Sequence, residues 1–415
     1  MDPDEMVGPT LHPVDLASRW TGSSVLDASD EAFGDKEDLL KPSAAAFEPG
    51  RYGNRGEIVD GWETRRRREP GHDWALIRLG TPGIITSVDV DTSFFTGNFP
   101  ESCSLDACGV EGYPSPKELR ASGIEWVSIV PRSPLRGDAH NAFPVSGRRR
   151  FTHVRLSIYP DGGVARLRVY GDVIPDPRLV DDVSVDLASD ELGGAIVATS
   201  DDFYTPARSL IRQDRARTMG EGWETRRRRD EGPDVVVLQL GLAGRVRRIE
   251  IDTAHFKYNA SKSVAVHCSA VQPPPAVAST AWSPLLRRTN LQPDTRHVFP
   301  IHQNGLVGSV RIDAYPDGGL SRVRVLGDVD PAARRRAGLR WFNALPAAQG
   351  VTCLVGEGIS PADAARIVDQ RPLPLEWRDR LGAGATGARV KSKGAYLEAL
   401  ARILDGAADR RATEQ

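Results

Sequence analysis

The stretch "RLSIYPDGGVARLRVYGDV" at residues 155–173 has a near copy, "RIDAYPDGGLSRVRVLGDV", at residues 311–329. In both copies two apolar-rich segments flank the turn sequence "PDGG". After the first turn, Leu167 and Val169 alternate with Arg166 and Arg168, the period-two pattern of a half-buried strand. Each copy therefore predicts two strands joined by a turn, and the doubling predicts two related β domains.

Three further blocks are doubled. They are "DGWETRRRR" (60–68) with "EGWETRRRR" (221–229), "VDTSFFTGN" (90–98) with "IDTAHFKYN" (251–259), and "ASDEAFGDKEDLLKP" (28–42) with "TSDDFYTPARSLIRQ" (199–213). The spacing between copies changes only between blocks, so the length differences fall in loops. The sequence therefore predicts a tandem duplication: a first repeat with an N-terminal extension at 1–185, a second repeat at 186–330, and a tail at 331–415 without a counterpart.

Short β-rich segments such as "WALIRLG" (74–80) and "VVVLQLG" (235–241) recur in both repeats, and helical periodicity is scarce before residue 331. This pattern predicts an all-β body of two tandem jelly rolls. The tail predicts a small helical appendage, with helical stretches at 330–350, 360–372 and 392–411. Asp330 and Ser360, each followed by Pro, are the expected N-caps of the first two.

The composition excludes several classes of protein. The net charge of −2 on 415 residues provides no general attraction to nucleic acid or to a membrane surface. No signal peptide and no apolar run long enough to span a membrane is visible. The four cysteines are scattered without a paired zinc spacing, which is typical of free thiols in a reducing compartment. We therefore expect a cytoplasmic protein.

The doubled "WETRRRR" block is the first candidate site. A solvated charged turn or a basic patch for nucleic acid would also explain a single copy, but acidic residues flank both runs and no aromatic ladder accompanies them. A buried Trp that anchors the block would instead leave Glu and Arg to face a ligand. Arg binds a carboxylate in a fork, and Glu accepts N–H donors or moves a proton. The candidates are Glu63 and Glu224 for catalysis, and Arg65, Arg66, Arg226 and Arg227 for substrate binding.

The second candidate is the block "IDTAHFKYN". On an extended segment His255, Lys257 and Asn259 would face one side, and Asp252 three residues earlier would form an acid–base pair with His255. A structural His capped by Asp is the alternative. The first repeat has Asn98 in place of Asn259 but lacks the His and Lys. The candidates are Asp252 and His255 for catalysis, with Lys257, Asn98 and Asn259 for binding.

Taken together, "DGWETRRRR", "VDTSFFTGNFP", "EGWETRRRR", "IDTAHFK" and the paired "YPDGG" segments resemble the allantoicase family over about residues 12–330. The resemblance implies two jelly rolls of the galactose-binding-like type, hydrolysis of allantoate to ureidoglycolate and urea in purine breakdown, and a homo-oligomer. The sequence departs from the family at Tyr258, where Gly is usual, and a large side chain there would alter a close approach of backbone to ligand.

Allantoate is a small acetate that carries two ureido groups, so its carboxylate suits an Arg fork and its N–H donors suit Glu. The resemblance assigns no cofactor, and it leaves open a divalent metal and whether one or both repeats hold a site. No ligand set for a metal is assigned. The alternative function is a non-catalytic protein that binds a carbohydrate or another small ligand on the same scaffold.

Overall fold

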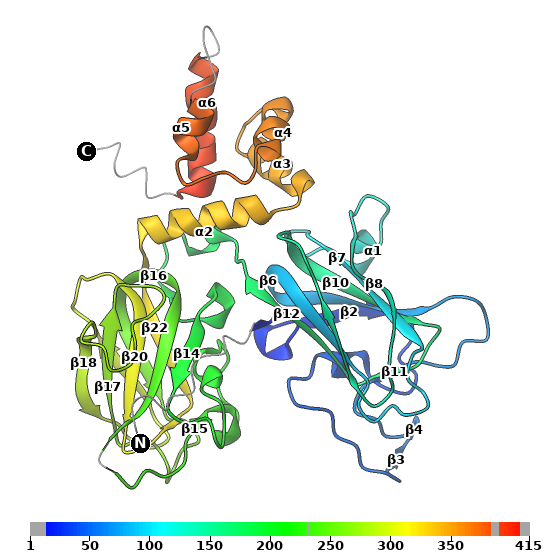
Figure 1. Ribbon diagram of the computed structural model, residues 1–415, viewed down its shortest axis with the longest axis horizontal. Coiled ribbons are helices and arrows are strands. Elements are labelled where there is room, and N and C mark those ends of the chain that lie inside the picture. Colours follow the sequence, from blue (N-terminus) through cyan, green and yellow to red (C-terminus); the bar gives the residue numbers. More distant parts are fainter. Residues whose placement is uncertain (1–13, 231, 383–389, 407–415) are drawn as a thin grey trace. The chain divides into compact units, whose positions relative to one another are not determined.

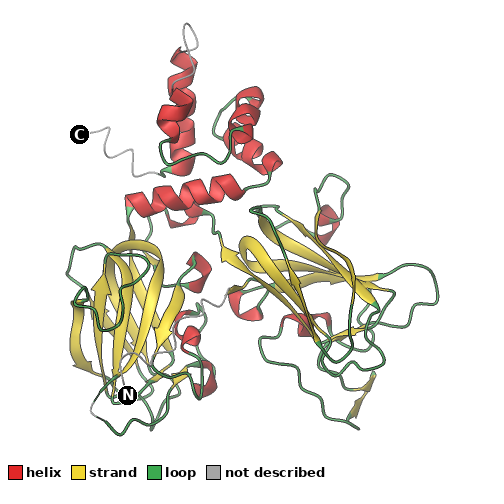
Figure 2. Cartoon of the chain, viewed as in Figure 1, coloured by secondary structure: helices red, strands yellow, loops and turns green. Residues whose placement is uncertain are grey.

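The computed structural model describes residues 14–230, 232–382 and 390–406 of the chain (Figure 1). Strands dominate up to residue 330 and helices follow (Figure 2). The described residues form two compact units, one of 14–175 with 343–371 and one of 176–342 with the described residues from 372 on. Each unit contains one β sandwich, so the predicted all-β body of two tandem jelly rolls is confirmed.

A single long strand, β6 (Asp73–Asp91), connects the two layers of the first sandwich. Its first part, residues 73–78, pairs with β2 (Ser24–Ala28) and β10 (Arg150–Tyr159). Its last part, residues 83–91, pairs with β9 (His140–Pro144) and β12 (Arg166–Val173). Between them the backbone passes so close to Thr21 that a Cβ on Gly80 would lie 2.3 Å from its carbonyl oxygen, which explains the glycine there.

The remaining strands of the first sandwich extend these two layers. β7 (Ser102–Cys108) and β8 (Val127–Pro134) continue from β10, and β1 (Val14–Asp15) pairs with β12. The short helix α1 (Pro116–Leu119) lies in the connection between β7 and β8, and β3 (Tyr52–Gly53) and β4 (Gly56–Glu57) form a separate hairpin. Cys103 and Cys108 lie on β7. Both are buried, and burial raises the pKa of each thiol to about 12.

The second sandwich repeats this arrangement around its own long strand, β16 (Asp234–Asp252). One layer contains its first part with β14 (Ala195–Thr199), β20 (Val307–Tyr315), β17 (Ser263–Ser269) and β18 (Ser283–Asn290). The other contains its last part with β19 (Arg296–Pro300), β22 (Arg322–Val329) and β13 (Val185–Asp186). Each strand of the first sandwich therefore has a counterpart in the second, whereas the separate β3–β4 hairpin has none among the described strands.

The segment "YPDGG" carries the chain from one layer to the other. β10 ends at Tyr159 and pairs with the first part of β6, whereas β12 begins at Arg166 and pairs with its last part. Between them β11 (Gly163–Val164) pairs with β5 (Trp62–Glu63), and in the second repeat β21 (Gly319–Leu320) pairs with β15 (Trp223–Glu224). The two predicted strands are confirmed, and each repeat places its "WETRRRR" block beside this turn.

Arg166 does not occupy the half-exposed position that the alternation predicted. It is buried, and its guanidinium pairs with Asp60 at 2.6 Å and donates to the backbone oxygens of Ser43 and Asp60. Arg322 is buried in the same way against Asp214, also at 2.6 Å. Segments far away in the sequence cover both arginines, so a pattern read within one strand could not reveal their burial.

Helices follow the second sandwich, as predicted: α2 (Pro331–Ala344), α3 (Ala347–Gly356), α4 (Pro361–Asp369), α5 (Trp377–Gly382) and α6 (Val390–Leu404). Asp330 accepts from the backbone of Ala332 and Ala333, and Ser360 caps α4, so both predicted caps are confirmed. The stretch 330–350, predicted as one helix, divides at Pro346. None of the described helices is long and apolar enough to cross a membrane.

Candidate active site

Trp62 and Trp223 fix the position of the two "WETRRRR" blocks. Both side chains are fully buried in the cores of their sandwiches. The indole nitrogen of Trp62 donates to the backbone oxygen of Asp30 at 2.7 Å, and that of Trp223 donates to the backbone oxygen of Asp201 at 2.8 Å. The tryptophan of each block is thus the anchor that the sequence predicted, and it holds the next residue, Glu63 or Glu224, at the edge of the core.

Glu63 and Glu224, the residues that follow these tryptophans, form the same contact in both repeats. Asn98 donates to Glu63 Oε1 at 2.7 Å, and Asn259 donates to Glu224 Oε1 at 2.6 Å. We call these the Glu–Asn pairs. Their members lie about 35 residues apart in sequence, in two separate doubled blocks, and the fold brings them together twice. Among the described residues the second carboxylate oxygen, Oε2, of neither Glu has a hydrogen bond, so each pair presents one fixed and one open oxygen.

Partial burial perturbs the first of these carboxyl groups. Burial raises the pKa of Glu63, and the hydrogen bond from Asn98 acts in the opposite direction. The side chain is half-buried, as is that of Glu224. A raised pKa makes the Glu63 carboxylate a stronger base than a fully solvated glutamate, and its contact with solvent lets it exchange a proton, which suits proton transfer.

The third arginine of each block is structural, a role that the sequence interpretation missed. Arg67 pairs with the buried Asp73 at 2.8 Å, and its backbone N–H donates to Asp161 of the first "YPDGG" turn. In the second repeat Arg228 pairs with the buried Asp234 at 3.0 Å. The signal was present in the sequence, because an Asp begins the long strand after each arginine run. These pairs join the block to the turn and to the long strand.

The predicted binding arginines face solvent. Arg65 lies 3.4 Å from Asp30 with 74% of its side chain exposed, and Arg226 lies 3.0 Å from Asp201 with 65% exposed. Arg226 also stacks on the ring of Phe203, 4.5 Å from the ring centroid. Arg66 and Arg227 are exposed as well. The structure therefore leaves these guanidinium groups accessible to an anion.

The block around His255 differs from its prediction. The backbone of His255 has φ of +69° in a turn, so the expected extended segment is wrong. Asp252 accepts from the backbone of Ala254, whereas His255 Nε2 contacts the carbonyl oxygen of Ala216 at 2.9 Å. The expected Asp–His pair is not formed. A short polar segment without glycine looks extended, but here Asp294 accepts from the His255 N–H at 2.7 Å and stabilises the left-handed turn.

Lys257 and Tyr258 are both exposed on this turn. Tyr258 is fully exposed, so its side chain extends away from the protein instead of filling a site. Its counterpart in the first repeat is Gly97, where an added Cβ would meet no atom within 4 Å. This position therefore has space for a side chain in both repeats, and Tyr258 does not alter the Glu–Asn pair beside it.

No group of three or more His, Cys, Asp or Glu side chains is placed to hold a metal ion within the part of the chain that the structure describes. The Glu–Asn pairs and the exposed arginines can themselves support acid–base and electrostatic chemistry. A carboxylate held by an amide can accept a proton from water or from an N–H group, and the neighbouring arginines can hold an anion.

The repeats match known proteins over most of the chain. The family model described as the allantoicase repeat matches residues 14–174 and again 185–330. A probable allantoicase of Streptomyces coelicolor is 43% identical over 342 residues, 79% of this chain and 89% of that protein. One of Nocardia farcinica is 47% identical over 317 residues, 76% of this chain and 94% of that protein.

The same similarity appears in three dimensions. The crystal structure of allantoicase from Saccharomyces cerevisiae matches with a TM-score of 0.63 and 32% identity, over 76% of this chain and 92% of that one. Both family-model matches coincide with the sandwiches that contain the Glu–Asn pairs. This chain belongs to the allantoicase family.

Proposed function

We propose that this protein hydrolyses allantoate to ureidoglycolate and urea, a step of purine breakdown, and that the Glu–Asn pairs mark where the reaction occurs. The observation that carries this assignment is the repetition of the same pair at the same place in both repeats. Membership of the allantoicase family supports the reaction, and the geometry supports the place.

The reaction needs an attack on the central carbon and a proton for the departing urea. Water loses a proton, its oxygen bonds to the central carbon, the C–N bond breaks, and the nitrogen of the leaving urea gains a proton. Glu63 or Glu224 suits the first transfer, because Oε2 is open while the Asn amide fixes Oε1. The same carboxyl group can return the proton to the leaving nitrogen, so one residue can serve both transfers.

The arginines suit the substrate carboxylate. Arg65 and Arg66 in the first repeat, and Arg226 and Arg227 in the second, present exposed guanidinium groups that can form bidentate bonds to it. His255 and Lys257 lie on the turn that carries Asn259 and stay candidates for contacts in the second repeat only. We assign Asp252 a positioning role, because it holds the backbone of that turn through Ala254.

We further propose that the protein is a cytoplasmic homo-oligomer. Its four cysteines are all free thiols, and three of them are buried, as expected in a reducing compartment. Light scattering on the purified protein would give the subunit number, and a monomeric mass at working concentration would contradict the oligomer.

The function is tested by measuring urea and ureidoglycolate released from allantoate by the purified protein, with and without a chelator. We expect the two products in equal amounts. Urea without ureidoglycolate would indicate a different bond cleavage, and no urea under either condition would leave only the binding function. Activity that is present without chelator and lost when chelator is added would show that the reaction needs a metal ion.

A further inference from the structure

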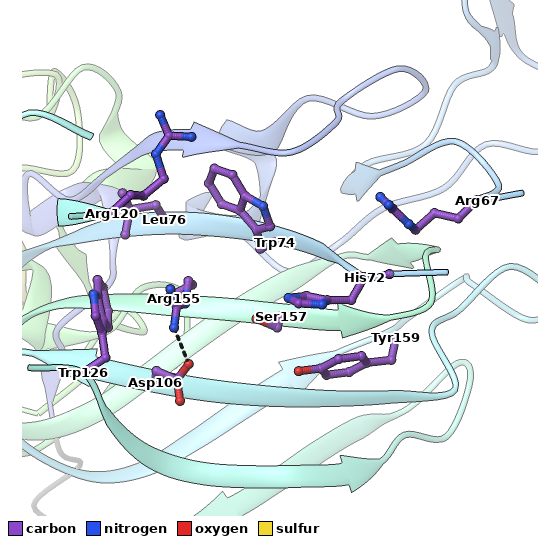
Figure 3. A pocket seen from close by; sticks show the side chains of 11 residues that line it. Arg67, His72, Trp74, Leu76, Asp106, Arg120, Trp126, Arg155, Ser157 and Tyr159 are labelled. Carbon is purple, nitrogen blue, oxygen red and sulfur yellow. Dashed lines mark hydrogen bonds and ion pairs between the residues drawn. The ribbon is translucent and has the colours of Figure 1, made fainter. Parts of the chain in front are cut away.

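The first sandwich has a cleft on the outer face of the layer formed by β6, β10 and β7. Arg67 of the "WETRRRR" block lines it, whereas Glu63 and Asn98 do not. Its volume is about 580 Å³, within the usual range for small-molecule sites. The strand register places Trp74 beside Ser157 and Leu76 beside Arg155, and Ser157 is buried. The small serine therefore forms the floor, and larger side chains rise around it (Figure 3).

Aromatic rings and guanidinium groups form the walls. Arg120 lies over Trp74 with its guanidinium carbon 5.4 Å from the ring centroid, and Arg155 lies over Trp126 at 4.8 Å. The rings of His72 and Tyr159 pack with their centroids 4.8 Å apart. Figure 3 shows these side chains around one opening. Flat rings with cations on their faces suit a ligand that stacks and carries negative charge.

The charges around the cleft favour an anion. Arg67, Arg120 and Arg155 form ion pairs with Asp73, Asp27 and Asp106, in that order. Arg132 adds a fourth guanidinium, which lies 4.2 Å from the centroid of Tyr159 and donates to Ser102. The pKa of His72 is lowered, first by burial and then by Arg155 and Arg67. Four guanidinium groups thus face three aspartates around the cleft, which leaves an excess of one positive charge.

The second repeat shows that the fold does not need this cleft. Val235 and Val237 replace Trp74 and Leu76, and both are buried against Val277 and Trp282. Asp313 replaces Ser157 and pairs with Arg311 at 2.7 Å, on the same strand. A hollow remains there at Arg288 and Tyr315, but no tryptophan lines it. Buried valines therefore fill the positions of Trp74 and Leu76 in the second repeat, whereas the first repeat keeps a cleft with aromatic walls.

We propose that this cleft binds a small planar heteroaromatic anion, whose ring packs against the stacked Trp–Arg walls and whose charged group contacts Arg120 or Arg155. It is a site separate from the Glu–Asn pairs, because neither Glu63 nor Asn98 lines it. The proposal does not depend on the hydrolase function, since it rests only on the geometry of the first sandwich.

The test is calorimetric titration of the full-length protein with orotate, a planar heteroaromatic carboxylate. Two analogues separate the contributions: uracil keeps the ring and loses the carboxylate, and cyclohexanecarboxylate keeps the charge and loses the flat ring. We expect orotate to bind and each analogue to bind at least about ten-fold more weakly. No heat with orotate, or equal binding of cyclohexanecarboxylate, would overturn the proposal.

Variants locate the binding. Arg120→Ala and Trp126→Leu should each weaken orotate binding about ten-fold, with thermal unfolding as the check on folding. Arg247→Ala is a matched control, because Arg247 is also a half-exposed arginine, paired with Asp328 in the second repeat. Unchanged affinity in both cleft variants would overturn the proposal. Competition between orotate and allantoate would overturn the separate site and make the cleft part of the reaction.

Discussion

Removal of the amide from both Glu–Asn pairs has a consequence that can be calculated from the structure. In the double variant Asn98→Ala with Asn259→Ala, each Glu loses a donor at 2.7 or 2.6 Å. A hydrogen bond to a charged group contributes about 1.5–3 kcal/mol, and the low end applies because both carboxyl groups are only half-buried. A loss of about 1.5 kcal/mol corresponds to roughly a ten-fold decrease in kcat/KM if the bond holds the carboxylate in its reactive form.

The single variants show how the two repeats share the reaction. If both sites work equally, Asn98→Ala alone lowers the rate about two-fold at most, because the second site is intact. If only the first repeat works, the single variant loses the full ten-fold. Rates of urea release by Asn98→Ala, Asn259→Ala and the double variant therefore distinguish the cases. Asn304→Ala, an exposed asparagine outside both pairs, is the control.

The pH dependence gives a second readout of the same change. The hydrogen bond from Asn98 lowers the pKa of Glu63, so its removal raises that pKa further. If the ionised carboxylate is the base, the acidic limb of the kcat/KM profile moves to higher pH. A double variant that keeps the full rate and an unchanged pH profile would refute the assignment of the Glu–Asn pairs to the reaction.

Three predictions concern stability. Arg67→Met should lower the free energy of unfolding by about 3 kcal/mol in denaturant, because it leaves the buried Asp73 without its cation. An unchanged denaturation midpoint would contradict the structural role of Arg67. Arg334→Met should destabilise the fold by a similar amount, since the buried Arg334 pairs with Asp181 at 2.6 Å and joins α2 to an earlier segment of the same unit. Resistance to proteolysis equal to that of the parent would argue against this role. Burial raises the pKa of Asp190 from 3.8 to about 7, so the folded state binds a proton more tightly than the unfolded chain does. The stability that this group contributes therefore falls as the pH rises from about 4 to 7. Asp190→Asn should flatten that part of the Tm-against-pH curve, and curves of the same slope would exclude Asp190 as the cause.

The fold was predictable from the sequence because the chain contains two copies of one unit, which can be compared with each other. Two copies of "YPDGG" with apolar segments on both sides indicated strands, and the structure has β10 and β12 in one repeat and β20 and β22 in the other. The long strand β6 was predicted only in part, as residues 74–80. Its continuation beyond Gly80 was not predicted, because a local pattern does not show that one strand can pair in both layers.

The candidate site was predictable in its residue types and less so in its geometry. Glu63 and Asn98 came from separate blocks, and only the fold shows that they touch. The prediction of a pair between Asp252 and His255 was wrong because Asp294, a residue of another loop, determines the backbone conformation of that turn. The structural role of Arg67 was missed because Asp73 lies just before the segment 74–80 that was predicted as a strand, and it was not considered as a partner of the arginine run. Contacts between loops depend on long-range packing, which the sequence does not show.

The most direct measurement is the rate of urea release from allantoate by the double variant Glu63→Gln with Glu224→Gln. Gln keeps the size of the side chain and removes the charge and the proton-transfer group, so we expect a loss of at least about ten-fold in kcat. Glu69→Gln, an exposed glutamate beside the first arginine run, should keep the parent rate. A double variant that folds like the parent and releases urea at the parent rate would show that the reaction takes place elsewhere on the protein.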